Sequence, residues 1–146
     1  MARYSVGTRS TGAGSTTLAV GSLFASAAVE AEVIEVGCFN TTAVACAVAL
    51  RRWTAVGTAG TGLSELPWNP DKPAATATAF DTHTITGTIT AGVYAQAALG
   101  AAIGAGVIWT FGERGLIIPK GTGNGITIMV ATGTGQILDW YIIWDE

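Results

Sequence analysis

The chain has 146 residues, of which 49% are hydrophobic and only 12% are charged, half of the roughly 25% that is usual in a soluble domain. Seven basic and ten acidic side chains give a formal net charge of -3, so the cationic field that binds phosphates is missing and we expect no nucleic-acid partner. The length allows a single domain with a real core. Abundant glycine, alanine and threonine, with little lysine, favour an all-β fold with many turns.

The first 17 residues are polar and rich in glycine, and they show almost no apolar periodicity. Such a segment contributes little to a core. We therefore expect a flexible N-terminal arm over residues 1–17, carrying Arg3, Tyr4 and Arg9, followed by a single β-sandwich domain over 18–146. No apolar signal segment begins the sequence, so we expect synthesis in a reducing cytosol, with free thiols.

Two alternating runs between Glu32 and Trp53 flank a short polar turn and predict a β-hairpin. With the turn centred on Thr42, the opposed pairs would be Glu32 with Arg52, Ile34 with Leu50, Val36 with Val48, and Cys38 with Cys46. The first pair would be a salt bridge and the last would be two small buried thiols. The other face of the second strand is a row of alanines that would approach either another subunit or a bulky layer of the same sandwich: Ala43, Ala45, Ala47 and Ala49.

The segment 54–80 contains three glycines and three prolines and predicts a long structured loop. Loops of this length in compact domains usually contact a partner or carry function. Trp68 lies within it, and two interpretations are open: the indole folds back onto its own domain, or it meets a partner.

Two later segments have unusual composition. Threonines at every second position from Thr82 to Thr90 predict a strand with a threonine face. Residues 93–111 are uncharged and nearly long enough to span a bilayer. They lack nearby basic residues on the N-terminal side, so two buried strands joined by a small-residue turn near 100–106 are the favoured interpretation, and a membrane partner is not expected.

The last third alternates strands and turns, with strands expected at 115–118, 126–131 and 136–144, a spacing that is typical of a sandwich or barrel. Both faces of the final strand are apolar, so it lies between sheets or at a subunit contact. One face carries Leu138, Trp140, Ile142 and Trp144, and the other carries Ile137, Tyr141 and Ile143.

No motif for catalysis, a cofactor or a metal is present. His83 and the two cysteines lack metal-ligand spacing, and no nucleophile elbow accompanies Asp81 and His83. The glycine-rich stretch 121–125 lacks the Lys-Ser/Thr of a phosphate loop and predicts a β-turn. We therefore expect a non-enzymatic protein without a cofactor.

Four segments resemble small virion structural proteins of tailed bacteriophages. They are Glu35-Val-Gly-Cys-Phe-Asn-Thr-Thr42, Leu50-Arg-Arg-Trp-Thr54 leading into Gly57-Thr58, Phe111-Gly-Glu-Arg-Gly-Leu-Ile-Ile118, and Ile143-Trp-Asp-Glu146. The resemblance spans roughly residues 30–146. It implies a jelly-roll-like antiparallel β-sandwich that forms a homo-oligomer, often a trimer, and sits on the virion as a capsid decoration (cement) protein or in the tail.

The leading hypothesis is therefore a decoration protein, made in the host cytoplasm and located on the virion, that binds the major capsid protein or other virion proteins. The expected partner-binding residues are Arg3, Tyr4, Arg9, Trp68, Trp140 and Trp144. Three alternatives stay open: a tail or fibre-base component, a protein inserted in a membrane through residues 93–111, and a carbohydrate-binding sandwich. The last would use Trp53, Trp68 or Trp109 as stacking platforms.

Overall fold

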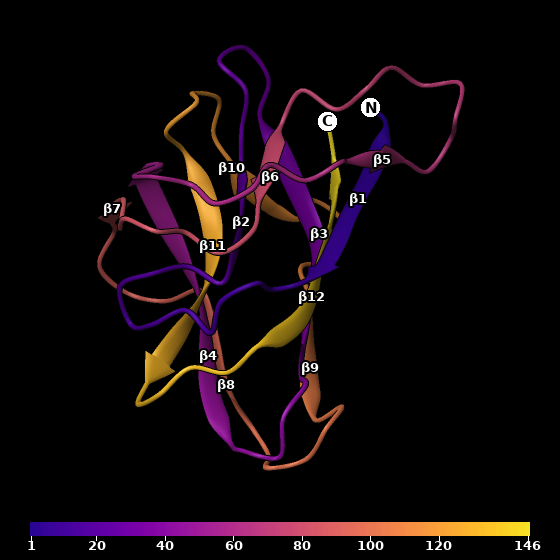
Figure 1. The fold of residues 1–146 in the computed structure, drawn as a ribbon. Coiled ribbons are helices and arrows are strands. Elements are labelled where there is room, and N and C mark those ends of the chain that lie inside the picture. The colour runs from indigo at the N-terminus through magenta and orange to yellow at the C-terminus, as the bar shows by residue number, and fades with distance from the viewer.

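The computed structural model describes residues 1–146 as twelve β-strands without a helix, in two antiparallel sheets that face one another (Figure 1). The predicted all-β antiparallel sandwich is confirmed. Sheet A contains β1 (Arg3–Arg9), β3 (Ala31–Asn40), β5 (Leu66–Pro67), β9 (Gly106–Thr110), β10 (Leu116–Ile118) and β12 (Leu138–Asp145). Sheet B contains β2 (Gly21–Phe24), β4 (Cys46–Ala55), β6 (Thr78–Phe80), β7 (Thr88–Ile89), β8 (Ala95–Leu99) and β11 (Gly125–Thr132).

The principal strands pair in a nested order. β1 pairs with β12, β2 with β11, β3 with β9, and β4 with β8. Within each sheet a late strand lies between two early ones, because β12 also pairs with β3 and β11 also pairs with β4. The chain thus winds as a folded antiparallel ribbon whose free ends are its termini, and Ala2 and Glu146 exchange backbone hydrogen bonds of 2.7 and 3.0 Å.

The main core lies between the sheets and contains 22 buried residues. The alternation of β12 supplies much of it: Leu138, Trp140, Ile142 and Trp144 are buried, whereas Tyr141 and Ile143 point outward. The predicted assignment of these side chains to two faces is confirmed. Trp140 requires a glycine opposite it, because a Cβ at Gly21 would overlap the indole ring.

The prediction of a flexible arm is wrong. Strand β1 is an internal strand of sheet A, hydrogen-bonded to β12 on one side and to β5 on the other. Tyr4 and Val6 enter the core with exposed fractions of 2% and 5%, and the Tyr4 ring stacks on Trp144 at a centroid distance of 5.8 Å. Two alternating apolar residues are enough to hold β1 in the sheet, because its backbone pairs with β12 along the whole strand. Residues 1–17 therefore belong to the same domain as 18–146.

The predicted hairpin between Glu32 and Trp53 is also wrong. Strands β3 and β4 lie in opposite sheets, and residues 41–45 cross between them. A hairpin within one sheet and two strands in opposite sheets both require apolar residues at every second position. In this structure the inward residues of β3 and β4 face each other across the core, whereas in a hairpin they would lie side by side. No ion pair joins Glu32 to Arg52; the two ion pairs of the chain are Arg3 with Asp145 and Arg9 with Asp139.

The two cysteines are buried free thiols, as predicted. Burial, and to a smaller extent the nearby Cys46, raises the pKa of the Cys38 thiol to about 12. Of the predicted alanine row, Ala49 is buried and Ala47 is half-buried on β4, whereas Ala43 and Ala45 are exposed and precede the strand. This row is therefore partly covered by the protein itself.

The predicted threonine strand is mostly absent, since only Thr88–Ile89 of this segment forms a strand, β7. Residues 95–110 do form two strands, β8 and β9, on either side of a small-residue turn, as predicted, but the strands belong to opposite sheets. The prediction that both strands are buried is wrong, because all their residues except Leu99 are exposed or half-buried. The structure has no helix that is long and apolar enough to traverse a bilayer. The segment 54–80 contains the short strands β5 and β6.

Candidate functional site

Part of the outer face of sheet B, around Phe24, Trp53 and Met129, is covered by the protein's own chain, whereas Gln96 and Ala98 of β8 are exposed. A second, smaller core lies on it and contains Ala19, Phe24, Trp53 and Met129. Val56, Phe80 and Ile89 pack against this group from the connecting segments. Trp53 is fully buried and its indole N–H donates to the Met129 sulfur at 3.2 Å. Trp53 is therefore not a platform for a sugar ring.

A buried serine–histidine pair lies in this second core. Ser22 Oγ and His83 Nε2 are 2.8 Å apart, and the imidazole stands edge-on to Trp53 with ring centroids at 4.9 Å. The Asp81 carboxylate accepts hydrogen bonds from the Thr11 amide rather than from His83. Burial lowers the pKa of His83. The three residues are thus each buried, and the aspartate does not orient the histidine as a catalytic triad requires.

The outer face of sheet A has a different character. Gly7, Tyr141, Gly37 and Ile108 lie side by side on β1, β12, β3 and β9. The Tyr141 ring lies over Gly37, and only glycine leaves room for it, because a Cβ at this position would overlap the ring. The Tyr141 hydroxyl donates to Glu35 Oε1 at 2.6 Å. Burial and this hydrogen bond raise the pKa of Tyr141 to about 12. The glycine lets an aromatic side chain lie along the sheet instead of standing away from it.

A second aromatic ring repeats the arrangement one row further along. Phe39 lies over Gly106 of the neighbouring strand, where a Cβ would overlap its ring. The Phe39 and Tyr141 rings are nearly parallel, at 22°, with centroids 6.4 Å apart. Together with outward aliphatic side chains they form a flat apolar surface, which we call the sheet A platform: Phe39, Ile108, Ile117, Tyr141 and Ile143.

The platform is accessible. Ile108 is 52% exposed and Ile117 is 44% exposed, while Phe39, Tyr141 and Ile143 are half-buried. No residue of the platform belongs to the buried clusters. Sequence reasoning placed Tyr141 and Ile143 on one face of the final strand but missed Phe39 and Ile108. The available signal was the glycine that each ring requires on the adjacent strand, which is recognisable only when the pairing is known.

Three of the six predicted partner residues are accessible. Arg3 and Arg9 lie at the border of the platform, and each holds an aspartate of β12 through two hydrogen bonds of 2.8 to 2.9 Å. Trp68 is 58% exposed. The prediction is wrong for Tyr4, Trp140 and Trp144, which are at most 2% exposed because they occupy inward positions of β1 and β12.

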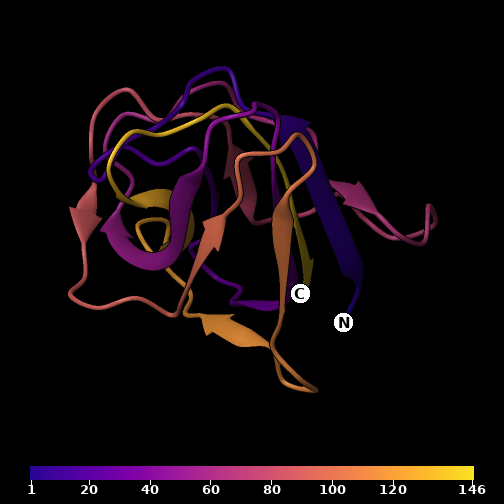
Figure 2. The same ribbon diagram turned by 90° about the horizontal axis from the view of Figure 1, so that it is seen from below.

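Trp68 begins the connection between β5 and β6, which extends well beyond the sandwich (Figures 1 and 2). Its amide donates to the Arg3 carbonyl at 2.8 Å, and the Arg3 guanidinium lies 5.6 Å from the centroid of its ring. Further along, the Tyr4 hydroxyl donates to the Pro73 carbonyl at 3.1 Å. Trp68 therefore lies outside the core but is held in place by Arg3, and its exposed indole lies beside the Arg3 guanidinium.

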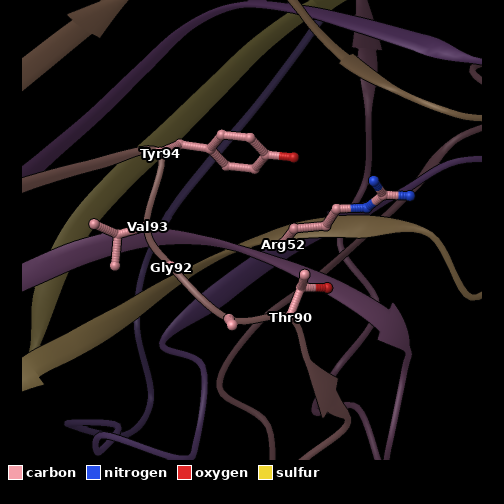
Figure 3. A pocket seen from close by; sticks show the side chains of 6 residues that line it. Arg52, Thr90, Gly92, Val93 and Tyr94 are labelled. Carbon is pink, nitrogen blue, oxygen red and sulfur yellow. The ribbon is translucent and has the colours of Figure 1, made fainter.

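Figure 3 shows a pocket of about 230 Å³ at the edge of β4. It is lined by Arg52 and by residues 90–94, which arch over this edge. Backbone hydrogen bonds hold both ends of the arch: the Thr90 amide donates to the Arg52 carbonyl at 3.0 Å, and the Tyr94 amide donates to the Leu50 carbonyl at 2.8 Å. Sequence reasoning did not identify this pocket, because it assigned Arg52 to a salt bridge with Glu32.

Trp109, the remaining candidate platform for a sugar, packs its half-buried side chain against the main core. Only Trp68 of the three tryptophans considered for carbohydrate binding is exposed. Comparison of the chain with protein families, with curated proteins and with solved structures finds no match.

Proposed function

We propose that this protein is a non-enzymatic virion structural protein, a capsid decoration (cement) protein of a tailed bacteriophage. It binds the head as a homo-oligomer, with a trimer favoured, and its partners are the major capsid protein or neighbouring virion proteins. The observation that carries the proposal is the sheet A platform, a flat apolar surface that the chain leaves accessible.

The strand order supports this assignment at the level of the fold. The pairs β1 with β12, β2 with β11, β3 with β9 and β4 with β8 are nested, and the members of successive pairs alternate between the sheets. We infer that the sandwich is a jelly roll, the double-sheet architecture found in viral capsid domains and in lectins. A shared fold does not fix a function, so the weight of the proposal rests on the surfaces.

The platform has the features of a contact between identical subunits. Aromatic and aliphatic side chains dominate it, which is typical of the core of an interface. Its border carries Arg3 and Arg9, whose charges are already neutralised by aspartates of β12. Two glutamates also lie on this face, Glu35 beside Ile143 and Glu32 beside Ile117, and Glu35 accepts the hydrogen bond of Tyr141. The exposed apolar side chains next to them gain by being removed from water, so the face suits a persistent contact. It replaces Trp140, Trp144 and the alanine row as the expected protomer contact.

The β5–β6 connection is the proposed contact with the capsid. It extends beyond the β5 edge of sheet A (Figure 2) and carries Trp68, which is 58% exposed, while the adjoining Leu66 of β5 is 64% exposed. Exposed tryptophan beside arginine is a frequent anchor in protein interfaces. The net charge of -3 agrees with a protein partner rather than the packaged nucleic acid. Location on the virion after synthesis in the host cytoplasm is part of the proposal.

The first experiment tests the platform by the oligomeric state. Light scattering after size exclusion should give an oligomer for the wild type and a monomer for Ile108→Glu, because the carboxylate would be buried in the contact. Ile85→Glu is the matched control, since Ile85 is 59% exposed on the segment that covers sheet B. A wild-type protein that stays monomeric at every concentration would contradict the proposal.

The second experiment tests the capsid contact by co-sedimentation with phage heads that lack the protein. Trp68→Ala should lower the occupancy of the heads, whereas Val44→Ala, which alters a side chain of similar exposure at 55%, should not. Val44 lies on the β3–β4 connection at the other end of the sandwich (Figure 1). Binding to purified tails instead of heads would favour the tail or fibre-base alternative.

A further inference from the structure

We infer that the pocket beneath residues 90–94 binds a carboxylate group through Arg52. This inference is independent of the proposed virion role, because the pocket opens at the edge of β4 in sheet B and includes no residue of the sheet A platform.

The first step is the incomplete hydrogen bonding of Arg52. Its Nη2 donates one long hydrogen bond, of 3.4 Å, to Asn124 Oδ1. Its Nε is buried and has no acceptor within the chain. Arg51 Nε, His83 Nδ1 and Trp140 Nε1 also lack a partner, but of these four groups only Arg52 lines a pocket. Because buried N–H groups are mostly satisfied in folded proteins, an acceptor is expected in that pocket. Arg3 and Arg9 show how the same side chain is completed elsewhere in the molecule, by an aspartate that accepts two hydrogen bonds.

The second step is the supply of backbone donors by the arch. Only its end residues, Thr90 and Tyr94, donate backbone hydrogen bonds to the chain, and the amides of residues 91–93 donate none. Gly92 has a φ of +89°, which turns the backbone between them, and a Cβ added there would meet nothing within 4 Å. Successive free amides at such a turn are a common environment for an anion.

The third step is the direction of the side chains. In Figure 3 the Tyr94 ring and the Arg52 side chain extend to the same side of the arch, and the Thr90 hydroxyl points that way as well. None of the six lining residues carries a carboxylate. The lining thus offers one permanent positive charge and two hydroxyl groups, with no acid to neutralise the guanidinium, and the unbonded amides of residues 91–93 belong to the same arch.

Carboxylate is favoured over phosphate because a single guanidinium matches its charge and its planar pair of oxygens. A phosphate ester would bring more negative charge to a chain whose net charge is already -3. The pocket volume of about 230 Å³ exceeds that of a single water, which takes roughly 30 Å³ in the liquid. Both a small organic acid and an Asp or Glu side chain of another protein would supply the group.

The test follows the Arg Nε–Hε resonances by NMR while sodium acetate is added at constant ionic strength. We expect a saturable shift at Arg52 and none at Arg114, an exposed arginine outside the pocket. Acetamide has the shape of acetate without its charge and should produce no saturable shift. A response at Arg52 that never saturates, or one that acetamide reproduces, would overturn the inference, and so would tighter binding of inorganic phosphate than of acetate.

Variants test the geometry. Tyr94→Phe removes one hydroxyl and should weaken acetate binding roughly 2- to 10-fold, the effect of a single hydrogen bond. Arg52→Lys removes the planar fork and should weaken it by more than about tenfold. If Arg52→Lys fails to fold, Tyr94→Phe still decides the matter, and acetate binding that it leaves unchanged would count against this pocket.

Two further titrations identify the source of the carboxylate. Tighter binding of a blocked aspartyl dipeptide than of acetate would support the inference and assign the site to a protein side chain. Tighter binding of succinate than of that dipeptide would support it and assign the site to a small organic acid.

Discussion

The outer faces of the two sheets shield their large apolar side chains from water in different ways. Both carry large outward side chains: Trp53, Phe24 and Met129 on sheet B, and Phe39 and Tyr141 on sheet A. On sheet B, connecting segments cover these side chains and form a second core. On sheet A, the two aromatic rings lie flat over glycines and keep one side accessible.

The difference teaches what an outward aromatic residue means in a sandwich. Covering sheet B orders long connections, and ordering them costs conformational entropy. Laying rings over Gly37 and Gly106 shields the rings partly and needs no additional chain. A face treated in the second way stays flat and free, which is why we base the proposed subunit contact on sheet A.

The largest expected effect comes from removing residues 1–9, the strand that completes the accessible sheet. β1 pairs with β12 along seven residue pairs and contributes Tyr4 and Val6 to the core. We expect the shortened chain to lose its cooperative urea transition, followed by circular dichroism. A shortened chain that unfolds as the full chain does would show that β1 is dispensable and that an arm is the better description.

The second largest effect is the difference in stability loss between a substitution on the covered face of sheet B and one on the accessible face of sheet A. Trp53→Ala should destabilise the protein by about 3–5 kcal/mol, because it empties the centre of the second core. Ile108→Ala, the matched change on the platform, should alter the stability of the isolated subunit by no more than about 0.5 kcal/mol. Urea denaturation of both variants at a concentration where the subunit is monomeric measures the contrast, and equal losses would erase the distinction between the faces.

A smaller effect is expected at the glycine beneath Tyr141. Gly37→Ala should cost about 1–3 kcal/mol, because the new methyl group must displace the ring. The double variant Gly37→Ala/Tyr141→Ala should recover part of this loss, since no ring remains to be displaced. The cycle is measured by thermal unfolding of the two single variants and the double variant. Strict additivity would show that the ring does not press on the glycine.

The last effect is a pH dependence confined to the covered face. Burial lowers the pKa of His83 below its usual value of 6.5, so the folded protein holds the ring neutral. The unfolded chain takes up the proton first as the solution becomes acidic. The contribution of His83 is therefore fully present above pH 6.5 and is lost as the pH falls below it. The wild type should lose more stability than His83→Gln between pH 7 and pH 5, by denaturant titration; parallel curves would contradict this.

The sequence predicted the strands better than their partners. A period of two assigns Leu138, Trp140, Ile142 and Trp144 to one face of β12, and the structure agrees. The same period cannot distinguish a hairpin from two strands that face each other across a core, so β3 and β4 were paired wrongly. β1 was missed because Tyr4 and Val6 are too few to produce a pattern until β12 is placed beside them.

The candidate sites were harder to predict, for a related reason. Both faces of β12 carry large apolar side chains, and the signal that separates them is the pair Asp139 and Asp145, which share the outward face with Tyr141 and Ile143. Trp140 and Trp144 were expected at a contact although they are buried, and Tyr141, on the other face, is the accessible residue. The Arg52 pocket depends on an arch that returns to β4 from about 40 positions later, at residues 90–94, and no local pattern encodes it.

The pairing of the first strand with the last sets an order of events during synthesis. Tyr4 and Val6 leave the ribosome early, but their partner strand β12, which ends at Asp145, is translated after the other eleven strands. At about 5–20 residues per second, the nascent chain waits roughly 7–30 s with these residues unpaired. Sheet A therefore cannot form completely until β12 has left the ribosome, and the accessible face of this sheet exists only from that moment.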